Sequence, residues 1–92
     1  MYQKTVIVKN ATGLHARPAS MFIAEAKKFE SKITLTRDGD SINAKSMVKL
    51  LTLGVCQGQS VTLSAEGSDE QAAVEVLSAL IESGFGEWGD EA

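Results

Sequence analysis

The sequence predicts an α+β fold, an open-faced two-layer sandwich in which helices cover one face of a small antiparallel sheet. Three observations predict it: four short segments typical of strands, three segments with helical periodicity, and their order strand–helix–strand–strand–helix–strand–helix. Strands that alternate apolar and polar residues are typical of a sheet with one face on the core and the other in water.

The four predicted strands are short and contain β-branched or alternating residues. The first is rich in Val, Thr and Ile, and the second alternates Ile33 and Leu35 with threonines. Asp38-Gly39 supplies the two-residue turn of a hairpin between the second and third strands. The predicted strands are residues 2–8, 32–37, 41–43 and 61–65.

The first two predicted helices each have a clear apolar face or clear ends. Residues 16–28 contain Ala19, Phe22, Ile23 and Ala26 at the spacing of one buried helix face. The second helix runs from about Met47 to Leu53, after Ser46 as candidate N-cap and before Gly54 as candidate C′ residue.

The third predicted helix begins after Ser68, with Gln71 three residues later in the pattern of a capping box, and ends at Gly84. The residues beyond Gly84 are acidic, include Trp88 and show no periodicity. We therefore expect one domain over residues 1–84 and an acidic, flexible tail over residues 85–92. The predicted buried stripe of this helix is Ala73, Val76, Leu77, Leu80 and Ile81.

Charge is divided unevenly along the chain. All nine basic residues and four acidic ones lie in residues 1–50, which carry +5, whereas residues 51–92 hold eight acidic residues and no basic one. This asymmetry indicates a basic surface that faces an acidic partner or an anion. Nucleic acid fits poorly as a partner, because the whole chain carries −3 and contains only five aromatic residues.

The chain has one cysteine, Cys56, and one histidine, His15. We therefore expect no internal disulfide, no metal site and no cofactor, and we expect Cys56 to pack as a small hydrophobe. No apolar run approaches the length of a membrane span, and no charged-then-apolar leader precedes the first strand. These observations predict a cytoplasmic protein that does not insert into a membrane.

His15 lies where a loop becomes a helix, in the segment Gly13-Leu14-His15-Ala16-Arg17-Pro18. The first N–H groups of a helix lack intrahelical partners and form the positive end of its dipole, so an anion is favoured there. Arg17 adds a planar fork of donors that suits phosphate oxygens. A nucleophilic nitrogen beside such donors is typical of covalent phosphoryl carriage.

Two other interpretations of His15 remain open at this point. The simpler one is that His15 is a polar helix cap and Arg17 a solvated charge. The other is a hydrolase that uses His15, which the sequence disfavours because acid–base catalysis needs a second group and none lies nearby in the chain.

Two segments resemble the HPr family, the histidine-containing phosphocarriers of the bacterial sugar phosphotransferase system. Residues 12–19 (Thr-Gly-Leu-His-Ala-Arg-Pro-Ala) are similar to the active-site signature of that family, and residues 43–54 are similar to its regulatory-serine region. The likeness continues through residues 61–67 and covers residues 1 to about 84. It implies a sheet of order 1-4-2-3 with three helices on one face.

The resemblance also implies a function. His15 would accept a phosphoryl group on Nδ1 from phosphorylated enzyme I and pass it to enzyme IIA domains for sugar uptake, with Arg17 assisting the transfer. The chain would then be a phosphocarrier with a phosphohistidine intermediate, not an enzyme with turnover of its own. The alternative within this fold is a nitrogen-branch or purely regulatory paralogue that acts by binding proteins.

Ser46 has a structural and a regulatory interpretation. As a favoured N-cap residue it needs no further role. In HPr relatives of low-GC Gram-positive bacteria, HPr kinase/phosphorylase phosphorylates this serine, and the modified form acts with a catabolite-control transcription regulator. A phosphate at a helix N-terminus is electrostatically favourable, so the resemblance makes Ser46 a candidate phosphoserine.

The first two helices carry more large apolar side chains than one stripe can bury, so some must be exposed near His15. Exposed methionines among lysines suit a surface that recognises several acidic partners in turn. We expect a monomer with this partner surface: Met21, Met47, Val48, Leu51, Lys27, Lys45 and Lys49.

Overall fold

The structure is a computed structural model that describes residues 1–10 and 13–86. Its strands and helices follow one another in the predicted order, with bounds within about two residues of the predicted ones. The elements are β1 (Tyr2–Ile7), α1 (Ala16–Ala26), β2 (Lys32–Arg37), β3 (Asp40–Asn43), α2 (Met47–Leu53), β4 (Ser60–Glu66), α3 (Glu70–Glu82) and the short 3₁₀ helix η1 (Gly84–Gly86).

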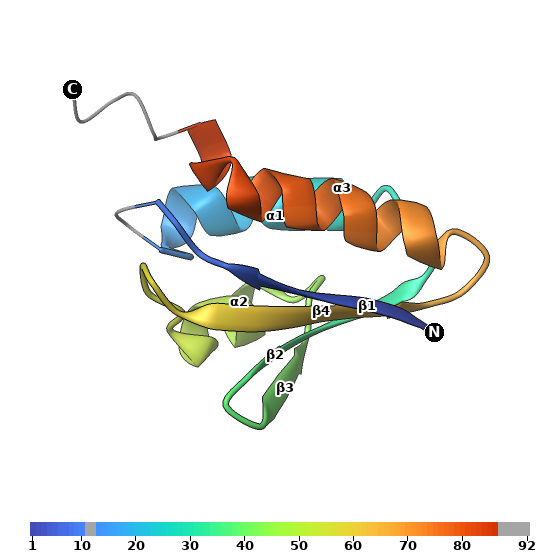
Figure 1. Ribbon diagram of the computed structural model, residues 1–92, viewed down its shortest axis with the longest axis horizontal. Helices are drawn as coiled ribbons and strands as arrows, with labels where there is room; N and C mark the ends of the chain where they lie inside the picture. Colours follow the sequence, from blue (N-terminus) through green and yellow to red (C-terminus); the bar gives the residue numbers. More distant parts are fainter. Residues whose placement is uncertain (11–12, 87–92) are drawn as a thin grey trace.

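The four strands form one antiparallel sheet in the order β1-β4-β2-β3. Helices α1 and α3 contact each other and lie on one side of this sheet, as Figure 1 shows. Helix α2 packs against α1 and β3 and adds Leu50 and Leu53 to the core. The predicted fold class and the implied strand order are both confirmed.

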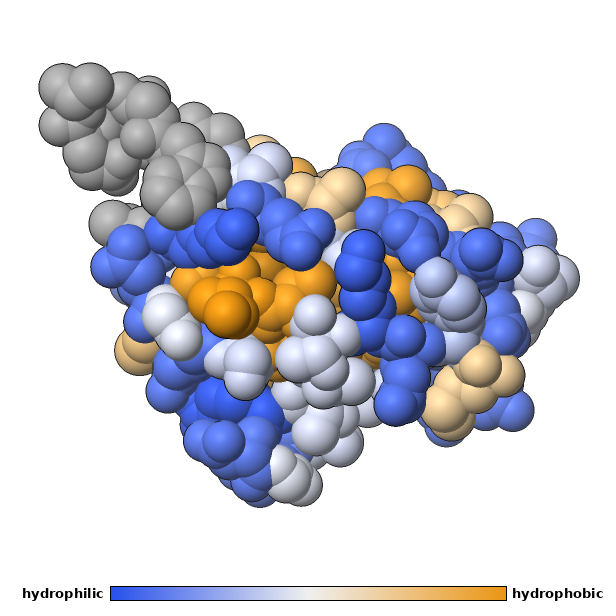
Figure 2. All heavy atoms as spheres, in the orientation of Figure 1, coloured by the Kyte–Doolittle hydropathy of each residue, from blue (hydrophilic) through white to orange (hydrophobic). Residues whose placement is uncertain are grey.

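The register of the strands separates an apolar face from a polar one. Val6 on β1 lies opposite Val61 on β4, and Leu63 on β4 lies opposite Leu35 on β2, so all four side chains are buried beneath the helices. Figure 2 shows hydrophobic atoms gathered between the helix layer and the sheet. The other face carries hydroxyl pairs that bond across strands: Thr5 with Thr62 at 2.9 Å, and Thr36 with Ser41 at 2.8 Å.

Helices α1 and α2 form as the sequence predicts. The four apolar side chains expected on α1 are buried, together with Pro18 in its first turn. Helix α2 begins after Ser46, whose hydroxyl accepts a hydrogen bond from the Lys49 amide, and ends at Gly54 in the left-handed conformation. The limits of α2 are therefore set by its own capping residues.

The predicted start of α3 is wrong. Its N-cap is Asp69 instead of Ser68, and the Asp69 carboxylate makes no capping bond because it binds the α1–β2 connection. In the predicted capping box, the Gln71 side chain would accept the Ser68 amide. Instead the Glu70 carboxylate accepts the Gly67 amide at 3.1 Å, one residue earlier in the chain. That hydrogen bond is the main reason why the pKa of Glu70 lies below its ordinary value.

The predicted stripe of α3 also needs correction. Val76 is 41% exposed and Leu80 only partly buried, whereas Val74 and Ser78 are buried in their place. The helix packs against β1, β4 and α1 together, so the rows 73/77/81 and 74/78 face the core.

The chain remains packed just beyond the predicted domain end. Phe85, expected in the flexible tail, is 4% exposed and belongs to the core, and its backbone adopts a left-handed conformation inside η1. The rest of the predicted tail, residues 87–92 with Trp88, lies outside the described residues. Within residues 1–10 and 13–86, no helix is both long and apolar enough to cross a membrane.

Candidate functional site

His15 is the N-cap residue of α1 and lies at the surface. Its carbonyl oxygen accepts the Ala19 amide at 2.8 Å, which closes the first turn of the helix. The imidazole makes no capping hydrogen bond. The His15 backbone begins the helix, but its side chain does not cap the helix. The interpretation of His15 as a polar cap is therefore not supported.

The backbone before His15 is held against residues 55 and 56. Leu14 is buried, and its amide donates to the Val55 carbonyl at 3.0 Å. Gly13 has a φ of +62°, and a Cβ at this position would lie 2.5 Å from the Val55 oxygen and 2.9 Å from the Cys56 Cα. Only glycine fits this close approach.

Asn10 also holds this segment, a role that the sequence analysis did not assign. Its side chain is 1% exposed, and its Nδ2 donates to the Gly13 carbonyl at 2.7 Å. The Gly13 amide donates back to the Asn10 carbonyl at 3.1 Å. An asparagine three residues before a positive-φ glycine is a turn signal, and it could have indicated this arrangement.

An open hollow of about 360 Å³ adjoins His15. One wall is the start of α1 and the other is formed by α2 and the chain after it. Cys56 is exposed on this wall, so the expectation that it packs in the core is wrong. The lining residues are Leu14, His15, Ala16, Leu51, Gly54, Val55 and Cys56.

The start of α1 offers donors for an anion beside His15. Ala16 and Arg17 have first-turn N–H groups without intrahelical partners, whereas Pro18 has no N–H to satisfy. The Arg17 side chain is exposed and makes no ion pair or hydrogen bond within the described part of the chain. Its guanidinium and these amides can therefore bind oxygens of a phosphate near His15.

Most residues of the predicted partner surface lie on α1 and α2, while Lys27 follows α1 and Lys45 precedes α2. Met21 is 38% exposed, Leu51 41% and Val48 73%, while Met47 is partly buried against the core. Lys27 and Met47 line one open hollow between the two helices, with Ser20, Ile23 and Ala24. Phe22 and Leu50 are fully buried and do not contribute to this surface.

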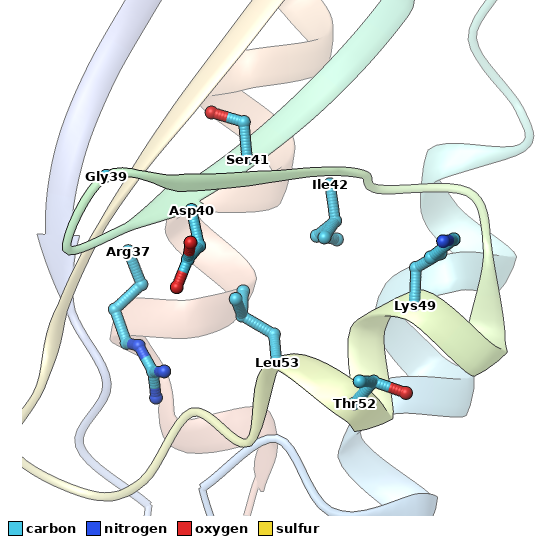
Figure 3. A pocket seen from close by; sticks show the side chains of 8 residues that line it. All are labelled: Arg37, Gly39, Asp40, Ser41, Ile42, Lys49, Thr52 and Leu53. Carbon is cyan, nitrogen blue, oxygen red and sulfur yellow. The ribbon is translucent and has the colours of Figure 1, made fainter.

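Two of the predicted lysines differ in their surroundings. Lys49 is exposed on α2 and lies in a groove of about 370 Å³ between that helix and the β2–β3 hairpin. Figure 3 shows this groove, which contains neither His15 nor Arg17. Lys45 is engaged elsewhere, because its ammonium donates to the carbonyls of Phe29 at 2.7 Å and Ser31 at 3.0 Å. Its charge is thus held at the α1–β2 connection.

No group of three or more His, Cys, Asp or Glu side chains able to hold a metal ion occurs among residues 1–10 and 13–86. The site therefore consists of one accessible imidazole, donors from the start of α1 and an apolar rim from α2. A small sandwich with one such histidine on an open surface has the features of a carrier of an anionic group.

The family assignment agrees with that class of protein. Residues 2–83 match the family described as "PTS HPr component phosphorylation site". The chain belongs to the HPr family, the phosphocarrier proteins of the bacterial phosphotransferase system, and it is not a stand-alone enzyme.

Individual relatives are similar over nearly their whole length. The phosphocarrier protein HPr of Haemophilus influenzae is 54% identical over 81 residues, 88% of this chain and 95% of that protein. The HPr-like protein Crh of Halalkalibacterium halodurans is 49% identical over 82 residues, 89% of this chain and 98% of that protein. A crystal structure of HPr from Thermoanaerobacter tengcongensis matches with a TM-score of 0.92 at 52% identity, covering 95% of this chain and 98% of that one.

Proposed function

We propose that His15 accepts a phosphoryl group from phosphorylated enzyme I and passes it to enzyme IIA domains in the cytoplasm. The observation that carries this proposal is an imidazole exposed on a backbone that Asn10 and Val55 hold in place. A carrier needs both features, because its histidine must fit two different partners without losing its position. All the residues invoked come from one chain, so we expect a monomer to suffice.

The chemistry follows from the groups around the imidazole. Nδ1 of His15 attacks phosphorus, the P–N bond forms, and the bond between phosphorus and the donor breaks. The moving group carries negative charge on its oxygens throughout. Arg17 and the first amides of α1 stabilise that charge, and the same donors then hold the phosphorylated imidazole until the next partner arrives.

Docking of the partners is assigned to the exposed residues of α1 and α2. Met21, Val48 and Leu51 supply apolar contact around His15, and Met47 supplies the edge of the adjacent hollow. Lys27 and Lys49 give this surface its positive charge, which steers an acidic partner. We leave Lys45 out of the surface because backbone carbonyls bind its ammonium.

Intact mass spectrometry tests the proposal directly. Incubation with enzyme I and phosphoenolpyruvate should add one phosphoryl mass to the wild-type chain, and mild acid should remove it because a phosphoramidate is acid-labile. His15→Ala should gain no mass while keeping the wild-type melting temperature, since the imidazole is exposed and makes no hydrogen bond to residues 1–10 or 13–86. Phosphorylation of His15→Ala at the wild-type rate would disprove the assignment.

We further propose that phosphorylation of Ser46 regulates docking, through an HPr kinase/phosphorylase where the host has one. Ser46 is partly exposed at the start of α2, directly before Met47 on the proposed docking surface. A dianion here would favour the helix start but introduce like charge toward an acidic partner. The modified form would then be suited to a different partner, such as a catabolite-control transcription regulator.

The regulatory paralogue remains the second candidate function. The Halalkalibacterium halodurans Crh is 49% identical to this chain, against 54% for the Haemophilus influenzae HPr, and the solution structure of Bacillus subtilis Crh describes it as a catabolite repression HPr. The exposed His15, beside an Arg17 side chain with no bond among the described residues, favours the phosphocarrier. The phosphorylation experiment separates the two functions: a purely regulatory or nitrogen-branch paralogue would gain little phosphate from sugar-branch enzyme I.

A further inference from the structure

Residues 54–59, which we call the supporting loop, contribute Gly54, Val55 and Cys56 to the wall of the hollow opposite His15. It connects α2 to β4 and touches the segment before His15 at two places: Val55 accepts the Leu14 amide, and Cys56 packs beside Gly13. Any displacement of this loop therefore displaces the residues that lead into His15. The contacts that hold the supporting loop therefore also determine the position of His15.

At its far end, the supporting loop is hydrogen-bonded to the residues that directly follow β1. The Val8 amide donates to the Gln59 carbonyl at 2.9 Å, the Gly58 amide donates to the Val8 carbonyl at 2.8 Å, and Gln57 Nε2 donates to the Lys9 carbonyl at 3.0 Å. These bonds fix residues 57–59. The part of the loop nearest to His15, residues 54–56, is held by two longer backbone bonds, from the Gly54 amide to the Leu51 carbonyl and from the Gln59 amide to the Cys56 carbonyl, both at 3.2 Å.

Arg37 holds that nearer part from the opposite side. Its Nη1 donates to the Gly54 carbonyl at 3.1 Å and to Gln59 Oε1 at 3.2 Å. Gln59 Oε1 also accepts the Cys56 amide at 2.8 Å. One guanidinium nitrogen thus joins the first and last residues of the supporting loop, and the amide oxygen it contacts fixes Cys56 between them.

The Arg37 side chain is held in place by its surroundings and is not a solvated surface charge. The side chain is only 20% exposed, and its Nε is buried, 4.0 Å from the Asp38 carboxylate. Figure 3 shows the side chain extending from the hairpin toward the backbone that follows Leu53, away from the residues in the middle of the groove. A charged donor to neutral acceptors makes a stronger hydrogen bond than a neutral donor does.

We propose that Arg37 is a positioning residue for phosphoryl transfer. It acts through the supporting loop, by holding Gly54 and Gln59 so that Val55 and Cys56 fix the segment that ends at His15. It touches neither the phosphoryl group nor the partner. This inference rests on the proposed function, in which His15 is the phosphoryl acceptor.

The test is single-turnover transfer from phosphorylated enzyme I to the full chain, measured over a range of carrier concentrations. Arg37→Met keeps the apolar stem and removes the donors. It should lower the maximal rate about tenfold and leave the half-saturating concentration unchanged, because geometry is lost and docking is not. Arg37→Lys, which restores a shorter cationic donor, should recover part of the rate.

Two further variants separate positioning from other effects. Lys32→Met removes the same charge from an exposed position at the other end of β2 and should leave the transfer rate unchanged. Gln59→Leu removes the shared acceptor. If Arg37 acts through Gln59, the double variant should transfer about as slowly as the slower single variant. In ¹H–¹⁵N spectra, Arg37→Met should shift the Leu14 and Cys56 amides, and Lys32→Met should not.

Three results would overturn the inference while leaving the proposed function intact. One is wild-type transfer by Arg37→Met with unshifted Leu14 and Cys56 amides. Another is a change confined to the half-saturating concentration, which would make Arg37 a docking charge. The third is an equal effect of Lys32→Met, which would indicate net charge alone. If Arg37→Met does not fold, the transfer rates of Arg37→Lys and Gln59→Leu are compared with wild type instead. Slower transfer by both variants supports the inference, and wild-type transfer by both overturns it. Absence of acid-labile phosphate on the wild-type chain would instead refute the proposed function.

Discussion

The start of α1 and the start of α3 lie at opposite ends of the molecule (Figure 1), and the polar side chains at these two ends differ in their hydrogen bonding. At the end away from His15, Asp69 accepts the amides of Glu30 and Ser31 at 2.8 and 3.0 Å and also the Ser31 hydroxyl. Ser31 is fully buried, and Lys45 binds its carbonyl from another element. At the site end, the side chains of His15 and Arg17 make no such bonds within the described residues.

The difference shows how a chain of this size combines stability with an accessible site. The far end ties the α1–β2 connection to the start of α3 through charged and hydroxyl side chains. The site end instead fixes its backbone, through Asn10, Gly13 and Val55, and leaves the side chains of His15 and Arg17 exposed. Substitutions at the two ends should therefore affect different measurements.

The largest effect is expected at Arg17. Arg17→Ala should slow transfer from phosphorylated enzyme I by about 10²–10³-fold, because one donor to the moving charge is lost. The melting temperature should stay at the wild-type value, since the Arg17 side chain is exposed and makes no bond to the residues that the structure describes. Arg17→Lys should recover only part of the rate, because a point charge lacks the planar fork of donors. Equal rapid-quench transfer rates for wild type and Arg17→Ala would contradict the role given to Arg17.

Gly13→Ala should lower the free energy of unfolding, although Gly13 lies at the site end of the molecule. The added Cβ meets the Val55 oxygen at 2.5 Å, in a left-handed conformation that alanine adopts poorly. We expect the free energy of unfolding to fall by about 3 kcal/mol in urea titrations. Gly39→Ala is the matched control: Gly39 also has a positive φ, +87°, but open space around it, so its loss should be smaller. Equal losses for the two variants would show that the close approach to Val55 is unimportant.

Ser46 should affect docking and stability in opposite directions. Ser46→Asp should reduce the transfer rate from enzyme I about tenfold at low salt, with the difference shrinking at high salt. Its carboxylate at the start of α2 should keep or raise the stability of the fold, by roughly 0.5 kcal/mol. Ser46→Ala should dock normally but melt at a lower temperature, because the capping bond to Lys49 is lost. Salt-independent transfer by Ser46→Asp would rule out this electrostatic explanation.

Asp69 should give the far end an acid-dependent stability. Hydrogen bonds from the Ser31 hydroxyl, and then from the Glu30 amide, lower the pKa of Asp69. A carboxylate with a lowered folded-state pKa stabilises the fold above its unfolded-state pKa of about 4, and this contribution is lost as pH falls through the folded-state pKa. Thermal melts of wild type and Asp69→Asn should therefore differ at pH 7 and converge below about pH 4. Phosphoryl transfer at pH 7 and moderate temperature should be the same in both.

Local patterns predicted the elements but not everything that tertiary packing decides. Helix α2 was predicted to its last residue because Ser46 and Gly54 are capping residues in their own right. The start of α3 was misplaced because the Asp69 side chain is used by a segment almost forty residues earlier in the chain. The strand order came from the resemblance to the HPr family, since alternation alone allows several orders for four strands.

The helix-start positions of the candidate site residues could be predicted from the sequence, but the contacts around them could not. His15, Arg17 and Ser46 stand out because helix-start positions have known electrostatic properties. Cysteine is usually buried and lysine usually solvated, whereas Cys56 is exposed and the Lys45 ammonium donates to backbone carbonyls. Only the packing of distant loops shows these two differences.

A ¹⁵N–³¹P correlation spectrum of the phosphorylated chain, with ¹⁵N in the imidazole of His15, tests directly whether His15 carries the phosphoryl group. Because His15 is the single histidine, any coupling of phosphorus to imidazole nitrogen belongs to it. We expect a single phosphorus resonance coupled to Nδ1, which disappears after mild acid. Coupling to Nε2, or an acid-stable resonance with no nitrogen coupling, would contradict it.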